Sequence, residues 1–188
     1  MKEATSKRVK IQLGNIKKNP FRDFLIYPIS EGKVEALIDS IKSTGYWESL
    51  IGRKTKDGVV EICFGHHRLE ALKQVYGNDY EIDIIVQPLT DSEMLKRMSK
   101  ENDEAYNCPI MAIDDSVNST ISYLESHSDE ARTFLTSAFP EAKRLRIGAP
   151  FVAKYLGMHV DKVEKSIERL NLIKDGIIDR EALYKLEI

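Results

Sequence analysis

The first hundred residues alternate between short strand-like segments and longer segments in which hydrophobic side chains recur at helical spacing. Four segments have the β-branched or alternating pattern of strands, and they are residues 9–13, 50–54, 59–64 and 81–87. Asp57-Gly58, between the second and third of them, is typical of a hairpin turn. The last segment is mostly apolar, which predicts a central strand.

Helices are predicted between these strands. Ser30 is a suitable N-cap for the first helix, and Gly45 follows its last turn. A second helix opens directly after Gly65, and a third begins at Asp91. The segment Asn19-Pro20-Phe21-Arg22 is expected to be a loop, because proline lacks a backbone donor and fixes φ.

The second half of the chain has helical patterns throughout. Helices are expected over residues 114–126, 128–139, 150–156 and 160–172, and Asp179 is expected to cap a last short helix. We therefore predict an α+β fold with two domains. Residues 1–106 form a small mixed sheet with helices, and residues 107–188 form an all-α domain.

The composition is that of an ordinary folded protein. Of 188 residues, 42% are hydrophobic and 31% are charged. The apolar runs are only a few residues long, whereas a membrane-spanning helix needs about 20, and no apolar segment follows the charged N-terminus. We therefore expect a cytoplasmic protein with no membrane partner. The net charge is −2, so nucleic-acid binding requires a local basic patch.

The chain has two cysteines, Cys63 and Cys108, and no pair with the spacing of a zinc site. Without an export signal, both are expected to be reduced. Cys63 lies on a predicted strand, and we expect it to be a buried core thiol.

Residues 62–71 end a strand, turn at Gly65 and open a helix. The first turn of a helix has unpaired N–H groups and the positive end of the helix dipole, so it suits phosphate oxygens. Glycine allows close approach, and Arg68 supplies a bidentate fork. His66 and His67 could donate hydrogen bonds or transfer protons near neutral pH. On local physics alone, a simple turn with surface histidines fits equally well.

Three sequence boxes occur in an order that is typical of one family. Asn19-Pro20-Phe21-Arg22 comes first, residues 38–45 follow, and Gly65–Ala71 is third, with Glu101-Asn102 further on. Together they resemble the N-terminal domain of the ParB family, within the ParB/sulfiredoxin superfamily, over roughly residues 9–106. The resemblance implies a ParB/sulfiredoxin-like fold for this part of the chain.

The resemblance also implies binding of CTP or another nucleoside triphosphate with Mg²⁺, and Glu101 would help to hold the metal ion. Nucleotide state would control how two subunits associate around double-stranded DNA. The implied role is plasmid or chromosome partition, or transcriptional regulation, by a homodimer. The nucleotide-binding residues implied are Gly65, His66, His67, Arg68, Arg22, Glu101 and Asn102.

The chain departs from the ParB pattern at two places. His66-His67 replace Glu-Arg, and Ala105 replaces the arginine of the Glu-Asn box. Weak CTPase-like hydrolysis is therefore left open, and no catalytic residue is assigned. Gly-His-His-Arg is similar to the box of free-serine kinases, so the alternative is a small-molecule kinase or phosphohydrolase. It would use one of these histidines with Glu31 or Glu35.

Residues 149–172 have the pattern of a helix-turn-helix, the motif that carries DNA binding in ParB proteins. Val152 and Leu156 would pack the first helix, Gly157 makes the turn, and Val163 buries the second helix. In such a motif the second helix enters the major groove. The expected DNA-binding residues are His159, Lys162, Lys165, Ser166, Arg169, Arg144 and Arg146.

Carboxylates weaken this expectation, because they are repelled by phosphates. Asp161, Glu164 and Glu168 lie on the same second helix. A structural or protein-binding role for the motif is therefore the alternative.

Overall fold

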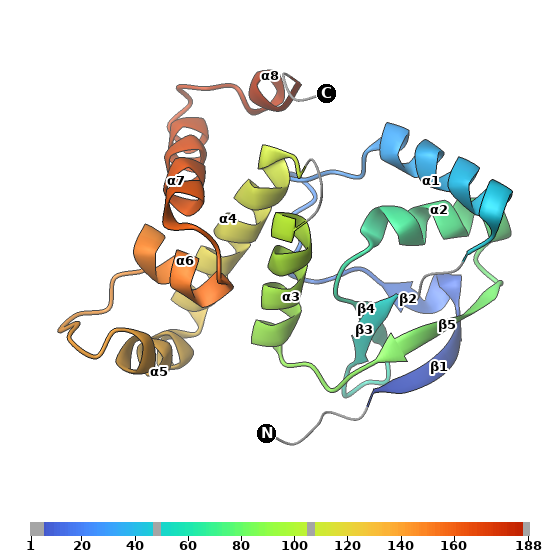
Figure 1. Cartoon of the computed structure of the whole chain (residues 1–188), viewed down its shortest axis with the longest axis horizontal. Coiled ribbons are helices and arrows are strands. Elements are labelled where there is room, and N and C mark those ends of the chain that lie inside the picture. Colours follow the sequence, from blue (N-terminus) through green and yellow to red (C-terminus); the bar gives the residue numbers. More distant parts are fainter. Residues whose placement is uncertain (1–5, 47–49, 105–107, 186–188) are drawn as a thin grey trace. The chain divides into compact units, whose positions relative to one another are not determined.

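The computed structural model describes residues 6–46, 50–104 and 108–185. The chain divides into two compact units (Figure 1). The first comprises Met1–Phe24 and Pro28–Arg97, and the second comprises Leu25–Tyr27 and Met98–Ile188. The sequence placed the boundary at residue 106, whereas the units divide inside helix α3 (Asp91–Glu104).

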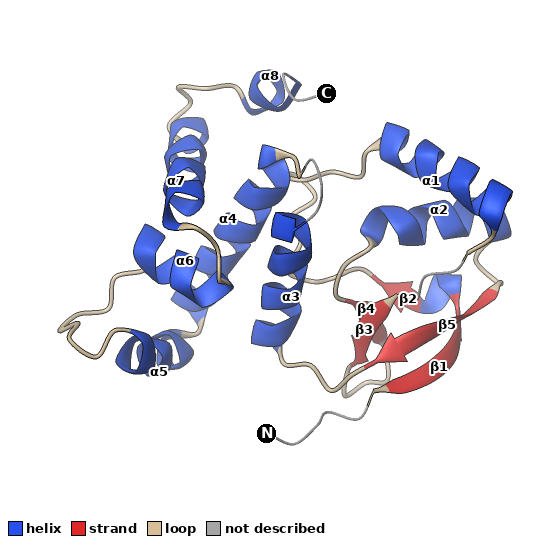
Figure 2. Cartoon of the chain, in the orientation of Figure 1, coloured by secondary structure: helices blue, strands red, loops and turns tan. Residues whose placement is uncertain are grey.

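The strands of the first unit are β1 (Lys7–Gln12), β2 (Ile16–Lys17), β3 (Ile51–Lys54), β4 (Val60–Ile62) and β5 (Glu81–Val86). Within the described residues they form one mixed sheet in the order β1-β5-β3-β4-β2 (Figure 2). β1 pairs with β5 and β3 with β4 antiparallel, whereas β3 pairs with β5 and β2 with β4 in parallel. β5 has a neighbour on each side, as its apolar sequence predicted.

Two helices, α1 (Glu31–Thr44) and α2 (His66–Tyr76), lie side by side over this sheet (Figure 1). The predicted cap of α1 is confirmed, since Ser30 accepts a hydrogen bond from the Lys33 amide and Gly45 ends the helix. Apolar side chains of both helices and of the strands form the core between them. Its most buried members include Leu13, Leu50, Ile62, Ala71, Leu72 and Ile84.

Cys63 lies in a smaller cluster with Leu89 and Met94. It is a fully buried thiol, as expected, and burial raises its pKa to about 11. Such a group is a poor nucleophile at neutral pH, because only the thiolate reacts. Cys63 is therefore part of the core and not of a reactive site.

The second unit consists of helices. They are the end of α3, α4 (Ile110–Ser126), α5 (Ser128–Ala138), α6 (Ala149–Leu156), α7 (Val160–Lys174) and α8 (Arg180–Lys185). α4 packs against both α5 and α7, and α6 packs against α7. Asp179 accepts from the amide of Ala182 at 2.8 Å, which confirms the predicted cap of α8. α4 begins four residues before the predicted start, directly after Pro109.

Asp114, where the helix was predicted to begin, lies inside α4. It is fully buried, and its carboxylate accepts from Nε and Nη2 of Arg169 at 3.0 and 2.6 Å. The hydroxyl of Tyr184 donates to the same carboxylate at 3.1 Å. This network joins α4, α7 and α8, and burial followed by the charge of Asp114 raises the pKa of Tyr184.

A second carboxylate joins three helices. Glu130 of α5 accepts hydrogen bonds from the hydroxyls of Tyr123 on α4 and Tyr155 on α6, each at 2.7 Å. Phe134 packs edge-on against Phe151 beside this contact, with ring centroids 5.3 Å apart.

No helix in the described part of the chain is long and apolar enough to cross a bilayer.

Candidate functional site

The start of α2 is a junction of strand, glycine and helix. Gly65 is the N-cap of α2, and its φ of 83° lies in the left-handed region that favours glycine. A Cβ at Gly65 would lie 2.9 Å from Cδ2 of Leu50, so the position is also crowded. The first turn of α2 has no acidic residue. Its first N–H groups, which have no acceptor within the helix, therefore present a positive end to an anion.

His66 is an internal residue. Its side chain is 3% exposed, and its Nε2 accepts a hydrogen bond from the Asn19 backbone N–H at 3.1 Å. Nδ1 lies 3.2 Å from Nη1 of Arg22, and the ring packs edge-on against Phe24 with centroids 5.6 Å apart. His66 thus ties the loop that contains Asn19 and Arg22 to the start of α2.

Asn19 fixes this loop, a role that the sequence analysis missed. Its Nδ2 donates to the carbonyls of Cys63 at 2.7 Å and Met94 at 3.4 Å, and its Oδ1 accepts from the amide of Phe21 at 2.9 Å. The available signal was the Asn19-Pro20 pair, because asparagine side chains commonly replace backbone hydrogen bonds in turns. Asn19 positions the loop and is too buried to bind a ligand.

Burial and positive charge act together on the two histidines. Burial lowers the pKa of His66 to about 2, with Arg22 and Lys18 acting in the same direction. Burial also lowers the pKa of His67 to about 4, and Arg22 and Lys33 add to that effect. Both side chains are therefore neutral at pH 7. The same three cations would attract an anion.

The two predicted arginines lie at this helix start. Arg22 is 8% exposed, and its Nη2 donates to the carbonyl of Pro28 at 3.4 Å, an oxygen that also accepts from His67. Arg68 is half-buried, and its Nη1 lies 3.7 Å from where a Cβ of Gly65 would be. The structure therefore assembles Gly65, His67, Arg68 and Arg22, with His66 behind them.

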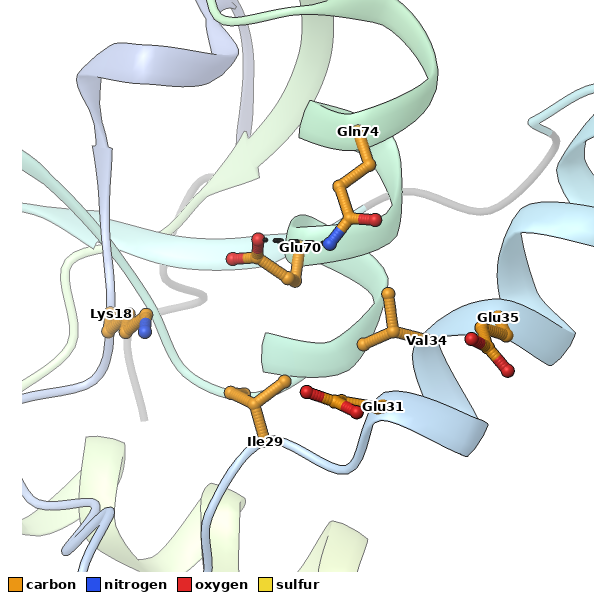
Figure 3. Close-up of a pocket in the computed structure, with 7 residues that line it drawn as sticks. All are labelled: Lys18, Ile29, Glu31, Val34, Glu35, Glu70 and Gln74. Atoms are coloured by element: carbon orange, nitrogen blue, oxygen red, sulfur yellow. Dashed lines mark hydrogen bonds between the residues drawn. The ribbon is translucent and has the colours of Figure 1, made fainter.

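A pocket of about 510 Å³ lies between α1 and α2 (Figure 3). Its lining is mostly polar and acidic, and consists of Lys18, Ile29, Glu31, Val34, Glu35, Glu70 and Gln74. Figure 3 shows the carboxylates of Glu31 and Glu35 on α1 and that of Glu70 on α2, where Gln74 donates to it at 3.4 Å. These carboxylates repel phosphate, but they include both acidic residues that the kinase alternative names.

Glu101 and Asn102 belong to the second unit. Asn102 is 8% exposed, and its Nδ2 donates to Oγ of Ser116 at 3.2 Å and to the carbonyl of Ala112 at 3.5 Å. Its amide thus holds α3 to α4. Glu101 is half-buried, and Ala105 lies outside the described residues. Among the described residues, no group of three or more His, Cys, Asp or Glu side chains could hold a metal ion.

The second candidate region is the pair α6 and α7, joined by the turn 157–159 as the sequence predicted. Two of its expected contact residues are not exposed. Ser166 is fully buried, and its hydroxyl has no hydrogen-bond partner among the described residues. Arg169 is bound bidentately to the buried Asp114. The prediction that these two side chains face outward is wrong, because α7 packs this face against α4.

The other expected contact residues are at the surface. His159 and Lys165 on the turn and α7 are exposed, as are Arg144 and Arg146 in the connector before α6. Lys162 is 45% exposed and forms an ion pair with Asp103 at the end of α3. The expected contact residues that are at the surface therefore lie in the connector and near the start of α7.

One comparison with known proteins shows the family of this chain. A family model described as the ParB N-terminal domain matches residues 1–103. A search of curated proteins found no match. A solved Pnob8-like ParB-N domain is 13% identical to this chain and matches it with a TM-score of 0.58. The match covers 91% of this chain and 72% of that chain. This structure shows a shared fold.

Two further solved structures are of the C-terminally truncated chromosome-partitioning protein ParB from Caulobacter crescentus. The complex with CTP-γ-S is 17% identical, with a TM-score of 0.45, and the match covers 96% of this chain and 92% of that one. The complex with the centromeric parS site is 16% identical, with a TM-score of 0.48, and the match covers 95% and 90% of the two chains.

Proposed function

Because the chain belongs to the ParB N-terminal domain family, we propose that it is a ParB-like DNA-binding protein whose first unit binds a nucleoside triphosphate. CTP is the first nucleotide to test, since the family resemblance implies it. The role that follows is plasmid or chromosome partition, or transcriptional regulation, by a homodimer whose association depends on the bound nucleotide.

The positive field at the start of α2 carries the nucleotide part of this proposal. The amides after Gly65 lie beside Arg22 and Arg68, and Lys18 and Lys33 contribute to the same field. Such an arrangement favours a polyphosphate over a neutral ligand. The imidazoles of His66 and His67 are neutral, so they add no positive charge that would repel the neighbouring cations. A neutral imidazole can still donate one hydrogen bond.

The residues take different parts in this model. The amides that follow Gly65 and the guanidinium of Arg68 hold phosphate oxygens, and His67 lies beside them. His66 acts indirectly, because it is buried and its Nε2 holds the Asn19 loop in place. Mg²⁺ bound by the phosphates would neutralise part of their charge.

The DNA part of the proposal rests on the second unit. α6 and α7 have the order and the short turn of a DNA-binding helix pair. His159, Lys165, Arg144 and Arg146 would contact DNA, and Lys162 would join them after leaving Asp103. Phosphate contacts by such residues give a binding constant that falls steeply with salt.

Isothermal titration with CTP, ATP, GTP and UTP in Mg²⁺ tests the nucleotide part. We expect heat with at least CTP for the natural protein. Arg68→Gln should bind at least about 10-fold more weakly, because it loses a charge-assisted hydrogen bond. Arg8→Gln, on exposed β1, is the matched control and should bind normally. No heat with any nucleotide would remove this part of the proposal, and phosphate release in the same samples measures hydrolysis.

Fluorescence anisotropy with a labelled duplex of random sequence tests the DNA part. We expect binding at low salt and a linear fall of the logarithm of the binding constant with the logarithm of the salt concentration. A natural protein that does not bind the duplex at low salt, with or without nucleotide, would contradict the proposal.

One observation favours a second candidate function. Glu31 and Glu35 line the same pocket, next to a helix that starts with Gly-His-His-Arg. A carboxylate in this place could accept the proton of a substrate hydroxyl during phosphoryl transfer, as in a small-molecule kinase. Incubation with free serine and ATP or ADP tests this. Phosphoserine formation that is lost in His67→Ala and Glu31→Gln would support the kinase, and its absence in the natural protein would exclude serine as the substrate.

A further inference from the structure

The last turn of α3 is fixed to the helical unit. Asn102 holds it to α4 through Ser116 and Ala112, and the next residue is Asp103. The side chain of Asp103 is 15% exposed, so its carboxylate is partly removed from water. An acidic group is therefore held in a fixed position within the same unit as the α6–α7 pair.

Asp103 is paired with a cation that the DNA-binding proposal needs. Its Oδ1 lies 2.5 Å from Nζ of Lys162, in the first turn of α7. The lysine itself is 45% exposed, so its ammonium can be reached from solvent. Lys165, on the next turn of the helix, is exposed as well.

We propose that Asp103 is an intramolecular competitor for DNA, which occupies Lys162 with a carboxylate until a DNA phosphate displaces it. This inference rests on the proposed DNA binding by α7. A carboxylate and a phosphate both accept hydrogen bonds from an ammonium, and the charge of Lys162 is largely neutralised while Asp103 is bound to it, so a DNA phosphate gains its full attraction only after the carboxylate has left. Displacement also leaves Asp103 without its cation close to the DNA, where it is repelled. The natural protein therefore binds DNA more weakly than a variant without the Asp103 carboxylate would.

The decisive property is that the gain from removing Asp103 depends on Lys162. Any carboxylate near DNA weakens binding through charge alone, so a single substitution does not separate competition from general repulsion. A double-mutant cycle does separate them, because it measures the energy that two side chains share. Glu164 offers a matched control, since it lies between Lys162 and Lys165 on α7 and its side chain is exposed.

The experiment measures binding of the full chain to a short random-sequence duplex by anisotropy, over a series of salt concentrations. The proteins are the natural chain, Asp103→Asn, Lys162→Gln, the double variant and the control Glu164→Gln. We expect Asp103→Asn to raise affinity by about 2- to 5-fold, the range for a partly exposed ion pair. That gain should vanish in the Lys162→Gln background, and Lys162→Gln should lower the salt slope by about 0.9 when Asp103 is absent.

Three outcomes would overturn the proposal. The gain from Asp103→Asn could be the same with and without Lys162, which would mean general repulsion. Asp103→Asn could leave the affinity of a DNA-binding natural protein unchanged, which would mean that the pair does not compete. If no protein of the set binds the duplex, the proposed DNA function fails, and this inference fails with it. Asp103→Ser repeats the test should the asparagine variant fold poorly, as judged by circular dichroism.

Discussion

Asn19 and His66, 47 positions apart in the sequence, are joined by a hydrogen bond from the Asn19 backbone N–H to Nε2 of His66 at 3.1 Å. Because this N–H can only donate, Nε2 must be the unprotonated nitrogen of the ring. A protonated imidazolium would have no acceptor and would break the contact. The attachment of the loop to α2 therefore depends on His66 remaining neutral.

This relationship predicts a stability that falls in mild acid. The pKa values of His66 and His67 in the folded state, about 2 and about 4, lie below the unfolded value of 6.5. The unfolded chain therefore takes up protons first, so stability is full above pH 6.5 and is lost as the pH falls below it. Between pH 7 and about pH 5.5, each histidine should cost about 1 kcal/mol of unfolding free energy.

Urea unfolding at both pH values measures this loss. His67→Gln should lose about 1 kcal/mol less than the natural protein over the same interval. His159→Gln replaces a histidine whose side chain is 74% exposed, and it should behave like the natural protein. Equal losses in His67→Gln and the natural protein would show that His67 is not held neutral by the fold.

Gly65→Ala should impair both folding and nucleotide binding. The left-handed conformation costs a residue with a Cβ about 1–2 kcal/mol, and the added methyl would also meet Leu50 at 2.9 Å. Gly157→Ala is the matched control, since Gly157 has nearly the same left-handed conformation (φ 72° and ψ 29°, against 83° and 30° at Gly65) but no heavy atom within 4 Å of the added Cβ. In thermal melts Gly65→Ala should be the less stable, and by calorimetry it alone should lose CTP affinity. Equal melting temperatures would mean that Leu50 yields without cost.

Arg169→Gln should be strongly destabilising, because it leaves the fully buried carboxylate of Asp114 without its cation. The expected loss is about 3–5 kcal/mol. Arg169→Lys should not restore stability, since an ammonium does not reproduce the bidentate contact. Chemical unfolding followed by helical circular dichroism measures both variants.

Arg144→Gln gives the opposite result from Arg169→Gln in the same assays. Arg144 is exposed, so stability should change by less than about 0.5 kcal/mol. The salt slope of DNA binding should fall by about 0.9, because one phosphate contact is lost. An unchanged slope would remove Arg144 from the proposed DNA surface.

Ser166→Ala should stabilise the second unit by up to about 1 kcal/mol, because the buried hydroxyl lost its water without gaining a protein partner. Ser116→Ala, also fully buried, should instead destabilise by about 1 kcal/mol. Its Oγ donates to the Ala112 carbonyl at 2.9 Å and accepts from Asn102 at 3.2 Å. Melting temperatures of the two variants that move in the same direction would contradict this assignment.

Local signals predicted most of the fold, because the formation of strands, turns and helix caps depends mainly on residues that are close together in the sequence. Gly65 and Ser30 are examples, since each marks a helix start by its own conformational or hydrogen-bonding preference. The sequence boxes also led to the family and to the correct helix start for the candidate site.

Burial of polar residues could not be predicted in the same way, because their partners are distant in the chain. Arg169 and Asp114 are 55 positions apart, and the sequence around neither residue indicates that the two form an ion pair. The same holds for His66, whose neutral, internal state depends on Asn19 and on burial. The errors therefore fall on residues whose surroundings are made by tertiary packing.

The carboxylate of Glu130 accepts hydrogen bonds from Tyr123 and Tyr155, and this contact bears on the sequence of the connector between α5 and α6. This contact fixes α6 to α4 and α5. The orientation of α6 therefore does not depend on the connector between α5 and α6. Substitutions in that connector can therefore retune its charge during evolution without disturbing the helices on either side.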